Sequence, residues 1–153
     1  MLMLYEITES GTGYAPIDPQ NKVIQDALTK TREHYQRFGF KRPWISFLAF
    51  EKGEYAGVCG FKAAPAGGKV EITYEPFPKK DDEVIAADMI RKLTEIANFH
   101  ERTADVTIYL SPEENANGLL KNLGFVNYGL VNTPEGKKMW EWRIGWMVSR
   151  KQL

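Results

Sequence analysis

The 153-residue sequence predicts an α/β (mixed α+β) fold, with one mixed, mostly antiparallel central sheet and helices on both of its faces. Two observations carry this prediction. Long segments repeat apolar residues at three- and four-residue steps, which is typical of helices, and shorter segments rich in β-branched and aromatic residues lie between Gly/Pro turns, which is typical of strands. With no linker or repeat to divide the chain, we expect a single domain over residues 1–153.

The first half of the chain predicts one helix and four strands. Residues 1–8 predict an edge strand, and Asp18 with Pro19 forms a helix opening, a carboxylate cap followed by proline. The helix then runs to Phe38, and Gly39 stops it. Residues 44–50 (expected to be a central strand), 55–62 and 70–74 form an antiparallel meander, in which Gly53 takes the positive φ of a hairpin turn.

The second half predicts two further helices and three strands. A long helix begins at residue 82, and a strand follows at 104–110, parallel to the strand at 70–74 because a helical crossover joins them. Residues 113–123 predict a short helix that ends at Gly124. Residues 125–131 and 137–148 predict a final hairpin.

Composition excludes several classes of protein. Twenty basic and twenty acidic residues cancel, so no overall charge attracts nucleic acid or an anionic membrane. A single cysteine, Cys59, excludes a disulfide framework, and no stretch approaches the roughly 20 apolar residues of a membrane span. The first six residues show neither the basic start nor the apolar run of a signal peptide. We expect a cytoplasmic protein without nucleic-acid or membrane partners.

The chain is organised around residues 69–100, a strand joined by a short loop to the long helix. Such a loop often binds phosphate, because the first N–H groups of a helix lack partners inside it. Here the loop places three acidic residues, Asp81, Asp82 and Glu83, at the helix start. An acidic cap that stabilises the helix is the alternative interpretation, worth about 1 kcal/mol.

Five segments, taken in order, are similar to the GNAT superfamily of acyl-CoA-dependent N-acetyltransferases, nearest the branch of ribosomal-protein alanine acetyltransferases. They are residues 43–47, 57–62, 70–74, 110–116 and 123–125. The resemblance spans residues 43–143, about two-thirds of the chain. It implies a GNAT-like fold and acetyl-CoA as co-substrate, with an amine of a small molecule or a peptide as acceptor.

The resemblance also implies site residues. Glu71 matches the glutamate that removes a proton from the incoming amine; a solvated glutamate on a sheet face is the alternative. The residues implied for acetyl-CoA are the strand end, where backbone N–H groups polarise the carbonyl, the start of the long helix, and one asparagine: Tyr74, Glu75, Pro76, Asp82, Glu83, Val84, Ile85, Ala86 and Asn115. Glu75 is a second candidate base, at a position expected to face solvent.

The sequence departs from the family pattern at two places, the phosphate loop and the position of a tyrosine. The glycines of the phosphate loop fall on Asp82 and Val84, and the basic position between them falls on Glu83. One like-charge contact at 4 Å costs roughly 1 kcal/mol in water and about 4 at an effective dielectric of 20; Lys79 and Lys80 could offset part of this cost. The tyrosine that protonates the leaving thiolate is replaced by Leu120. Asn115 is retained, with N-capping of the short helix as its alternative role.

Other distinctive residues receive mainly structural interpretations. Trp140, Trp142 and Trp146 alternate with polar residues on one face of a strand, which favours core packing; an acceptor-pocket wall or a homodimer interface is the alternative. Cys59 is expected in the core. His34 and His100 lie too far apart in the sequence to predict a metal site.

Two functions remain open from the sequence. The first is an N-acetyltransferase with Glu71 as general base. The second is a catalytically degenerate GNAT-fold binding or regulatory module that does not use acetyl-CoA, which the acidic helix start and Leu120 favour.

Overall fold

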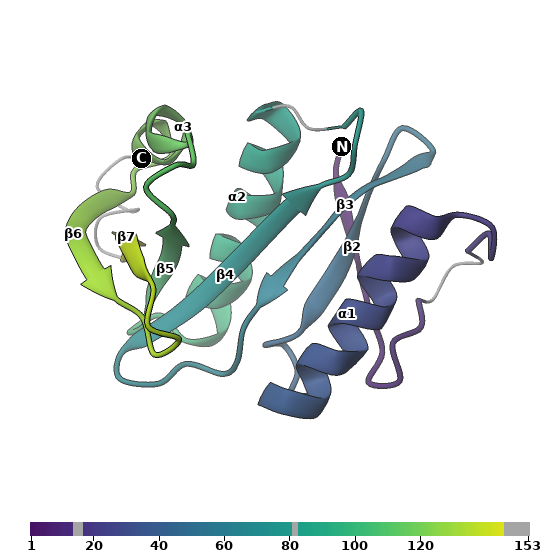
Figure 1. The fold of residues 1–153 in the computed structure, drawn as a ribbon, viewed down its shortest axis with the longest axis horizontal. Helices are drawn as coiled ribbons and strands as arrows, with labels where there is room; N and C mark the ends of the chain where they lie inside the picture. The colour runs from purple at the N-terminus through teal and green to yellow at the C-terminus, as the bar shows by residue number, and fades with distance from the viewer. Residues whose placement is uncertain (14–16, 81–82, 146–153) are drawn as a thin grey trace.

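The computed structural model describes residues 1–13, 17–80 and 83–145, and these form a seven-stranded mixed sheet with three helices (Figure 1). The strands follow the spatial order β1-β2-β3-β4-β5-β7-β6. Their bounds are β1 Met3–Glu6, β2 Ser46–Glu51, β3 Glu54–Phe61, β4 Lys69–Pro76, β5 Asp105–Leu110, β6 Val126–Asn132 and β7 Lys138–Ile144. The helices are α1 Lys22–Phe38, α2 Glu83–His100 and α3 Asn117–Asn122.

The sheet is antiparallel at every pairing except one. β4 and β5 pair in parallel, since α2 carries the chain from the end of one strand to the start of the other. The remaining neighbours pair antiparallel, and β7 lies between β5 and β6. The predicted mixed, mostly antiparallel sheet is therefore confirmed. β2 pairs with β1 on one side and β3 on the other, so it is an interior strand, second from the edge of the sheet.

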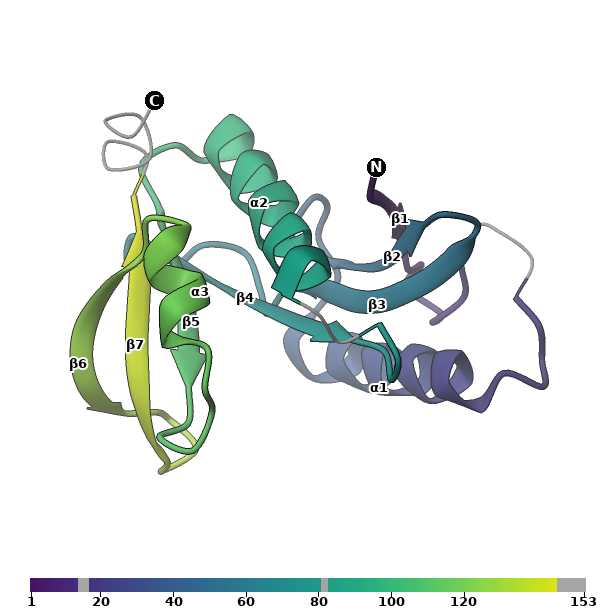
Figure 2. The same ribbon diagram turned by 90° about the horizontal axis from the view of Figure 1, so that it is seen from above.

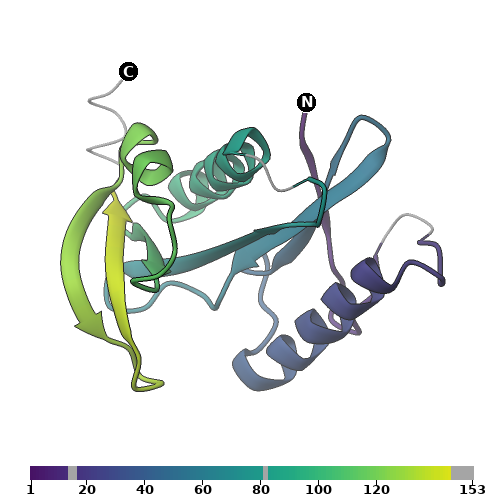
Figure 3. The same cartoon turned by 45° about the horizontal axis from the view of Figure 1, so that its top comes forward.

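Helices cover both faces of the sheet, as predicted. Figure 2 shows α1 on one side of β3 and β4 and α2 on the other, and Figure 3 shows α3 on the side of α2. The buried face of α1 consists of Ile24, Ala27, Leu28, Thr31 and Tyr35. α2 buries a broader set, since seven of its residues lie in the core: Ile85, Ala86, Ala87, Met89, Ile90, Leu93 and Ala97.

Two helix starts differ from the sequence prediction. α1 begins after Asn21, whose side-chain oxygen accepts a hydrogen bond from the N–H of Ile24 at 3.2 Å, so Asn21 rather than Asp18 is the cap. The side chain of Asp18 instead accepts a hydrogen bond from the N–H of Gln20 in the preceding turn. α3 begins at Asn117, four residues later than expected. Both regions offer several competing cap residues within four positions, and sequence alone does not rank them.

The predicted turns are confirmed. Gly39 has φ of 95° and donates its N–H to the carbonyl of Tyr35, which ends α1. The β2–β3 hairpin turns through Lys52 and Gly53, both with positive φ, and Gly124, with φ of 96°, follows α3. In the described residues, no helix is long and apolar enough to cross a membrane.

Candidate functional site

Glu71 lies where β4 and β5 stop pairing. The two strands pair only at Lys69 with Asp105, Val70 with Val106 and Glu71 with Thr107, although β4 continues to Pro76 and β5 to Leu110. Thr107 is 1% exposed, and its hydroxyl donates a hydrogen bond of 3.2 Å to the carbonyl oxygen of Val70, beside the last paired residues of the two strands. We call the unpaired continuation of the two strands the splay. It begins after Glu71, three residues before Tyr74.

The backbone of β4 directs one N–H group into the splay. The carbonyl of Glu71 accepts from Lys62, just after β3, and the N–H of Phe77 donates to Ala56 of β3. Odd-numbered residues therefore face β3, and by the alternation of an antiparallel pair Ile72 and Tyr74 face β5. The N–H of Ile72 belongs to the last paired step of the ladder, at Glu71 and Thr107. Pro76 has no N–H. Of the predicted group at Tyr74, Glu75 and Pro76, only Tyr74 can donate toward the splay.

The carboxylate of Glu71 belongs to a cluster of three charged side chains. Lys62 Nζ lies 3.7 Å from Glu71 Oε1 and 3.0 Å from Oε1 of Glu135, a residue of the β6–β7 turn. The Glu71 side chain is only 26% exposed. Burial raises its pKa above the ordinary glutamate range, Lys62 opposes that rise, and Glu135 adds to it. A carboxylate with a raised pKa, next to a cavity, has the properties of a general base.

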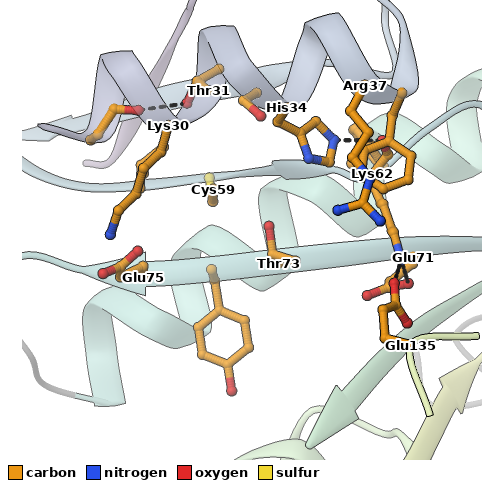
Figure 4. A pocket seen from close by; sticks show the side chains of 16 residues that line it. Lys30, Thr31, His34, Arg37, Cys59, Lys62, Glu71, Thr73, Glu75 and Glu135 are labelled. Carbon is orange, nitrogen blue, oxygen red and sulfur yellow. Dashed lines mark hydrogen bonds and ion pairs between the residues drawn. The ribbon is translucent and has the colours of Figure 1, made fainter. Parts of the chain in front are cut away.

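Residues of α1 form the opposite wall of a cavity of about 400 Å³ beside this cluster (Figure 4). His34 Nε2 lies 2.7 Å from the carbonyl oxygen of Lys62, and the His34 ring packs on Phe38 at 4.7 Å between centroids. Figure 4 shows Arg37 at the end of the cavity nearest Glu71 and Lys30 at the end nearest Glu75. Glu75 is exposed, as the sequence predicted.

A second cavity, of about 760 Å³, opens over β4, β5 and β7 and shares Lys62, Glu71 and Glu135 with the first. Glu141 of β7 is buried at its wall, 3.7 Å from Lys69 Nζ and in contact with the guanidinium of Arg143. Burial and the neighbouring Glu141 raise the pKa of Tyr109 to about 12, so its hydroxyl stays protonated at neutral pH.

Sequence reasoning missed this second group of residues. Glu141, Tyr109 and Lys69 come from three strands that are separate in the sequence, and their register brings them together. The sequence did hold one indication of this group: Glu141 and Arg143 alternate with tryptophans, which implies that one face of β7 is polar.

The predicted phosphate loop and the start of α2 carry both basic and acidic residues. Lys79 takes φ of 71°, a left-handed conformation uncommon for a residue with a side chain. The ammonium of Lys80 forms an ion pair with Glu54, which engages a cation that could otherwise meet phosphate. Glu83 opens α2 with a negative charge. Asp81 and Asp82 lie outside the described residues.

The first turn of α2 presents its predicted residues differently. Val84 is 67% exposed, whereas Ile85 and Ala86 are 5% and 6% exposed and pack into the core. The side chains of Ile85 and Ala86 are therefore not suited to a phosphate contact. Their assignment to acetyl-CoA stays a prediction.

Tyr74 lies on β4 along the splay, and Asn115 lies in the segment between β5 and α3. Tyr74 is half-buried. Its burial and the negative charge of Glu114, in the loop before α3, raise the pKa of its hydroxyl. Asn115 is exposed. The position before α3 is occupied by Ala116, which makes no side-chain hydrogen bond, so the capping interpretation of Asn115 is wrong.

The remaining candidates are core residues. Leu120 is 0% exposed, so no proton donor stands at the position where the family pattern has a tyrosine. Trp142 is buried and Trp140 packs against the core; Trp146 lies outside the described residues. Cys59 is 2% exposed, and burial raises the pKa of its thiol. Within the described ranges, no three His, Cys, Asp or Glu side chains are grouped to ligate a metal.

Known structures share this arrangement of strands and helices. A mutant form of the spermidine/spermine N-acetyltransferase SpeG from Vibrio cholerae is similar over 99% of this chain and 97% of its own, with a TM-score of 0.70 and 11% identity. The ribosomal L7/L12 alpha-N-protein acetyltransferase RimL is similar over 94% and 92%, with a TM-score of 0.67 and 15% identity.

A third similar structure is the microcin C7 self immunity acetyltransferase MccE, in complex with acetyl-CoA and AMP. It covers 80% of this chain and 71% of its own, with a TM-score of 0.60 and 15% identity. No protein-family model matches the sequence, and no curated protein matches it. The chain has the fold of the GNAT acetyltransferases.

Proposed function

We propose that this chain is an N-acetyltransferase that transfers an acetyl group from acetyl-CoA to a primary amine of a small molecule or a protein N-terminus. The observation that carries the proposal is the position of Glu71, with its raised pKa, at the point where β4 and β5 separate beside two cavities. The fold shared with SpeG, RimL and MccE supports the same class of reaction.

In a direct transfer, different residues of the site have different roles. The carboxylate of Glu71 takes a proton from the acceptor ammonium, and the amine nitrogen then attacks the thioester carbonyl carbon. A C–N bond forms, and the C–S bond breaks. The N–H group of Tyr74, which points into the splay, would stabilise the developing oxyanion. Because Leu120 donates no proton, the thiol departs as thiolate, which a free-thiol pKa of about 8.5 permits.

The splay fits the thioester arm better than the loop fits the phosphates. Beyond Glu71, the facing edges of β4 and β5 are not paired with each other, so their backbone groups can form hydrogen bonds with an extended arm that contains amides, as with an added strand. At the helix start, by contrast, Glu83 opposes negative charge and Lys80 is paired with Glu54. We therefore expect acetyl-CoA to bind mainly through its pantetheine arm.

A binding or regulatory module without acyl transfer is the second candidate. Two specific observations favour it. Lys62 already forms an ion pair with Glu71, and Glu83 places a negative charge at the start of α2, where the phosphates would bind. In that case the two cavities would bind a ligand that makes no use of a thioester.

Thermal melting separates the two. Acetyl-CoA at millimolar concentration should raise the melting temperature by several degrees, because a ligand that binds only the folded state stabilises it by about 2.7 kcal/mol at a hundred times its Kd. Thiol release across a panel of primary amines and N-terminal peptides then measures transfer. An unchanged melting temperature excludes the acetyltransferase as proposed, and a shift without thiol release for any amine favours the binding module.

A further inference from the structure

Lys62 places an amine of the protein inside its own candidate site. Its Nζ is the atom that lies between the carboxylates of Glu71 and Glu135, and its side chain is 26% exposed. The ammonium also lies 5.1 Å from the centre of the Phe38 ring, which covers it from α1. No step of the proposed transfer uses this residue.

The backbone at Lys62 is fixed on both sides. Its N–H donates to the carbonyl of Glu71 at 2.9 Å, and its carbonyl oxygen lies 2.7 Å from Nε2 of His34. The side chain therefore starts from a defined point beside β4, and its flexible stem reaches the beginning of the splay. Figure 4 shows Lys62 and Glu71 directed toward each other beneath α1.

From this geometry we infer that Lys62 is itself an acyl acceptor, modified on Nζ by the acyl-CoA thioester that the site takes. The inference rests on the proposed function. Glu71 accepts a proton from the ammonium, and the free Nζ attacks the thioester carbonyl carbon. The new C–N bond becomes an amide as the nitrogen loses its second proton, and the C–S bond breaks. The thiolate takes up this second proton and Glu71 releases the first to solvent, so the products are N-acyl-Lys62 and CoA thiol.

Position distinguishes Lys62 from Lys30, Lys69, Lys121 and Lys138. Lys69 lines the larger cavity but pairs with the buried Glu141 rather than with Glu71. Lys30 lines the smaller cavity at the end where Glu75 lies. Lys121 and Lys138 are exposed on α3 and β7. An amine held next to a base reacts as if at a much higher concentration than one that meets the thioester by diffusion.

Acylation also changes the site. The amide has no charge, so the ion pairs from Lys62 to Glu71 and Glu135 are lost. Glu71 and Glu135 would then share the cavity without the cation that now lies between them. A positively charged acceptor amine could take that place without competing against Lys62.

The test follows acetylation of the full chain by acetyl-CoA with no added amine. Digestion with a protease that does not cleave at lysine, followed by mass spectrometry, gives the occupancy of each lysine over time. We expect Lys62 to gain an acetyl group at least about tenfold faster than Lys121 and Lys138, a threshold set below the roughly 100- to 10,000-fold that a positioned base contributes. E71Q should remove this advantage and leave the rates at Lys121 and Lys138 unchanged.

Two controls address folding and chemical background. K62R keeps the positive charge, and circular dichroism checks that it is folded. Acylation of Lys62 without an added amine releases one equivalent of CoA thiol, and K62R should not show this rapid release. Acetyl phosphate, which acetylates lysines without the splay, should give Lys62 no advantage over Lys121. The inference is overturned if Lys62 follows the exposed lysines with acetyl-CoA, or if E71Q leaves its rate intact.

The result separates this inference from the proposed function. If acetyl-CoA raises the melting temperature and an added amine releases thiol while Lys62 stays unmodified, only the self-acylation is overturned. If acetyl-CoA produces no thermal shift and Lys62 reacts at the rate of Lys121, both are overturned.

Discussion

Glu71 is the last residue of β4 that pairs with β5, and Thr107 is its partner there. Because both strands continue beyond this pair without pairing to each other, the side chain of Glu71 and the backbone N–H group of Tyr74 lie along one opening. The base and the oxyanion donor of the proposed transfer thus follow from the strand register. The predictions below test this arrangement part by part.

Replacing Glu71 by glutamine should lower kcat for acetyl transfer by roughly two to four orders of magnitude, the usual contribution of a positioned general base. KM for acetyl-CoA should change little, because the amide keeps the size of the side chain. The matched control is Glu95→Gln on the exposed side of α2, which should retain full activity. Thiol release under saturating amine measures both variants. Equal rates for wild type and E71Q would show that the carboxylate takes no part in proton removal.

Lys62 and Glu135 should shift the pH profile in opposite directions. Burial raises the pKa of Glu71, Lys62 lowers it, and Glu135 raises it, with the Tyr109 hydroxyl also close to the cavity. Since the base must be deprotonated, activity should rise with pH through this raised pKa. K62M removes the favourable cation, so the acid limb of kcat/KM should move to higher pH.

Glu135→Gln is the opposite case, because it removes a neighbouring negative charge and leaves Lys62 to Glu71 alone. The acid limb should then move to lower pH. The measurement is kcat/KM from about pH 5 to pH 9 in buffers of constant ionic strength, since salt screens partly exposed pairs. Shifts of the same sign in both variants would contradict the assignment of the limb to Glu71.

Gly57 tests how closely β3, the end of β4 and α2 pack. A Cβ at this position would lie 2.6 Å from the carbonyl oxygen of Glu75 and 2.8 Å from Cε of Met89. Gly57→Ala should therefore lower the free energy of unfolding by about 1–3 kcal/mol, the usual cost of overpacking. It should also weaken acetyl-CoA binding, because the displaced segment belongs to the splay.

The matched control is Gly118→Ala on α3, where a Cβ would meet no atom within 4 Å. In an exposed helix this change should raise the free energy of unfolding by up to about 1 kcal/mol. Urea denaturation of both variants gives the comparison. If G57A is as stable as wild type, the contact between β3 and the end of β4 is looser than the structure places it.

Local sequence patterns were enough for the elements but not for their caps. Gly39 and Gly124 stand at the two helix ends that they predicted, because a positive φ is available at little cost to glycine. Asp18 and Asn115 did not cap helices, because Asn21 and Ala116 hold those positions instead. Cap choice depends on the exact backbone path, which tertiary packing decides.

The candidate site was predictable only in part, and for a related reason. Glu71 could be named from its position in the chain, but its partner Lys62 could not, since the pair depends on the register between β3 and β4. Glu135 is 73 residues from Lys62, and the β6–β7 turn brings it there. Charges that act on one another across strands leave no periodic signal in the sequence.

The acidic start of α2 should determine which part of acetyl-CoA contributes to affinity. Glu83 stands in the first turn of this helix, where it complements the helix dipole and opposes phosphate. Glu83→Gln should tighten acetyl-CoA binding up to about tenfold, which corresponds to about 1.4 kcal/mol and to one like-charge contact relieved near the surface. The same change should cost a few tenths of a kcal/mol in stability.

Acetyl-pantetheine provides the control ligand, because it has the thioester arm and no phosphate. Its affinity should be the same for wild type and E83Q. The affinity of wild type for acetyl-CoA should fall as ionic strength falls, because less salt screens the repulsion from Glu83, and E83Q should lose this part of the salt dependence. Isothermal titration calorimetry of both ligands with both proteins measures the difference. Equal gains for the two ligands would place the effect outside the phosphates, and no gain for either would mean that the loop after β4 lies away from the bound co-substrate.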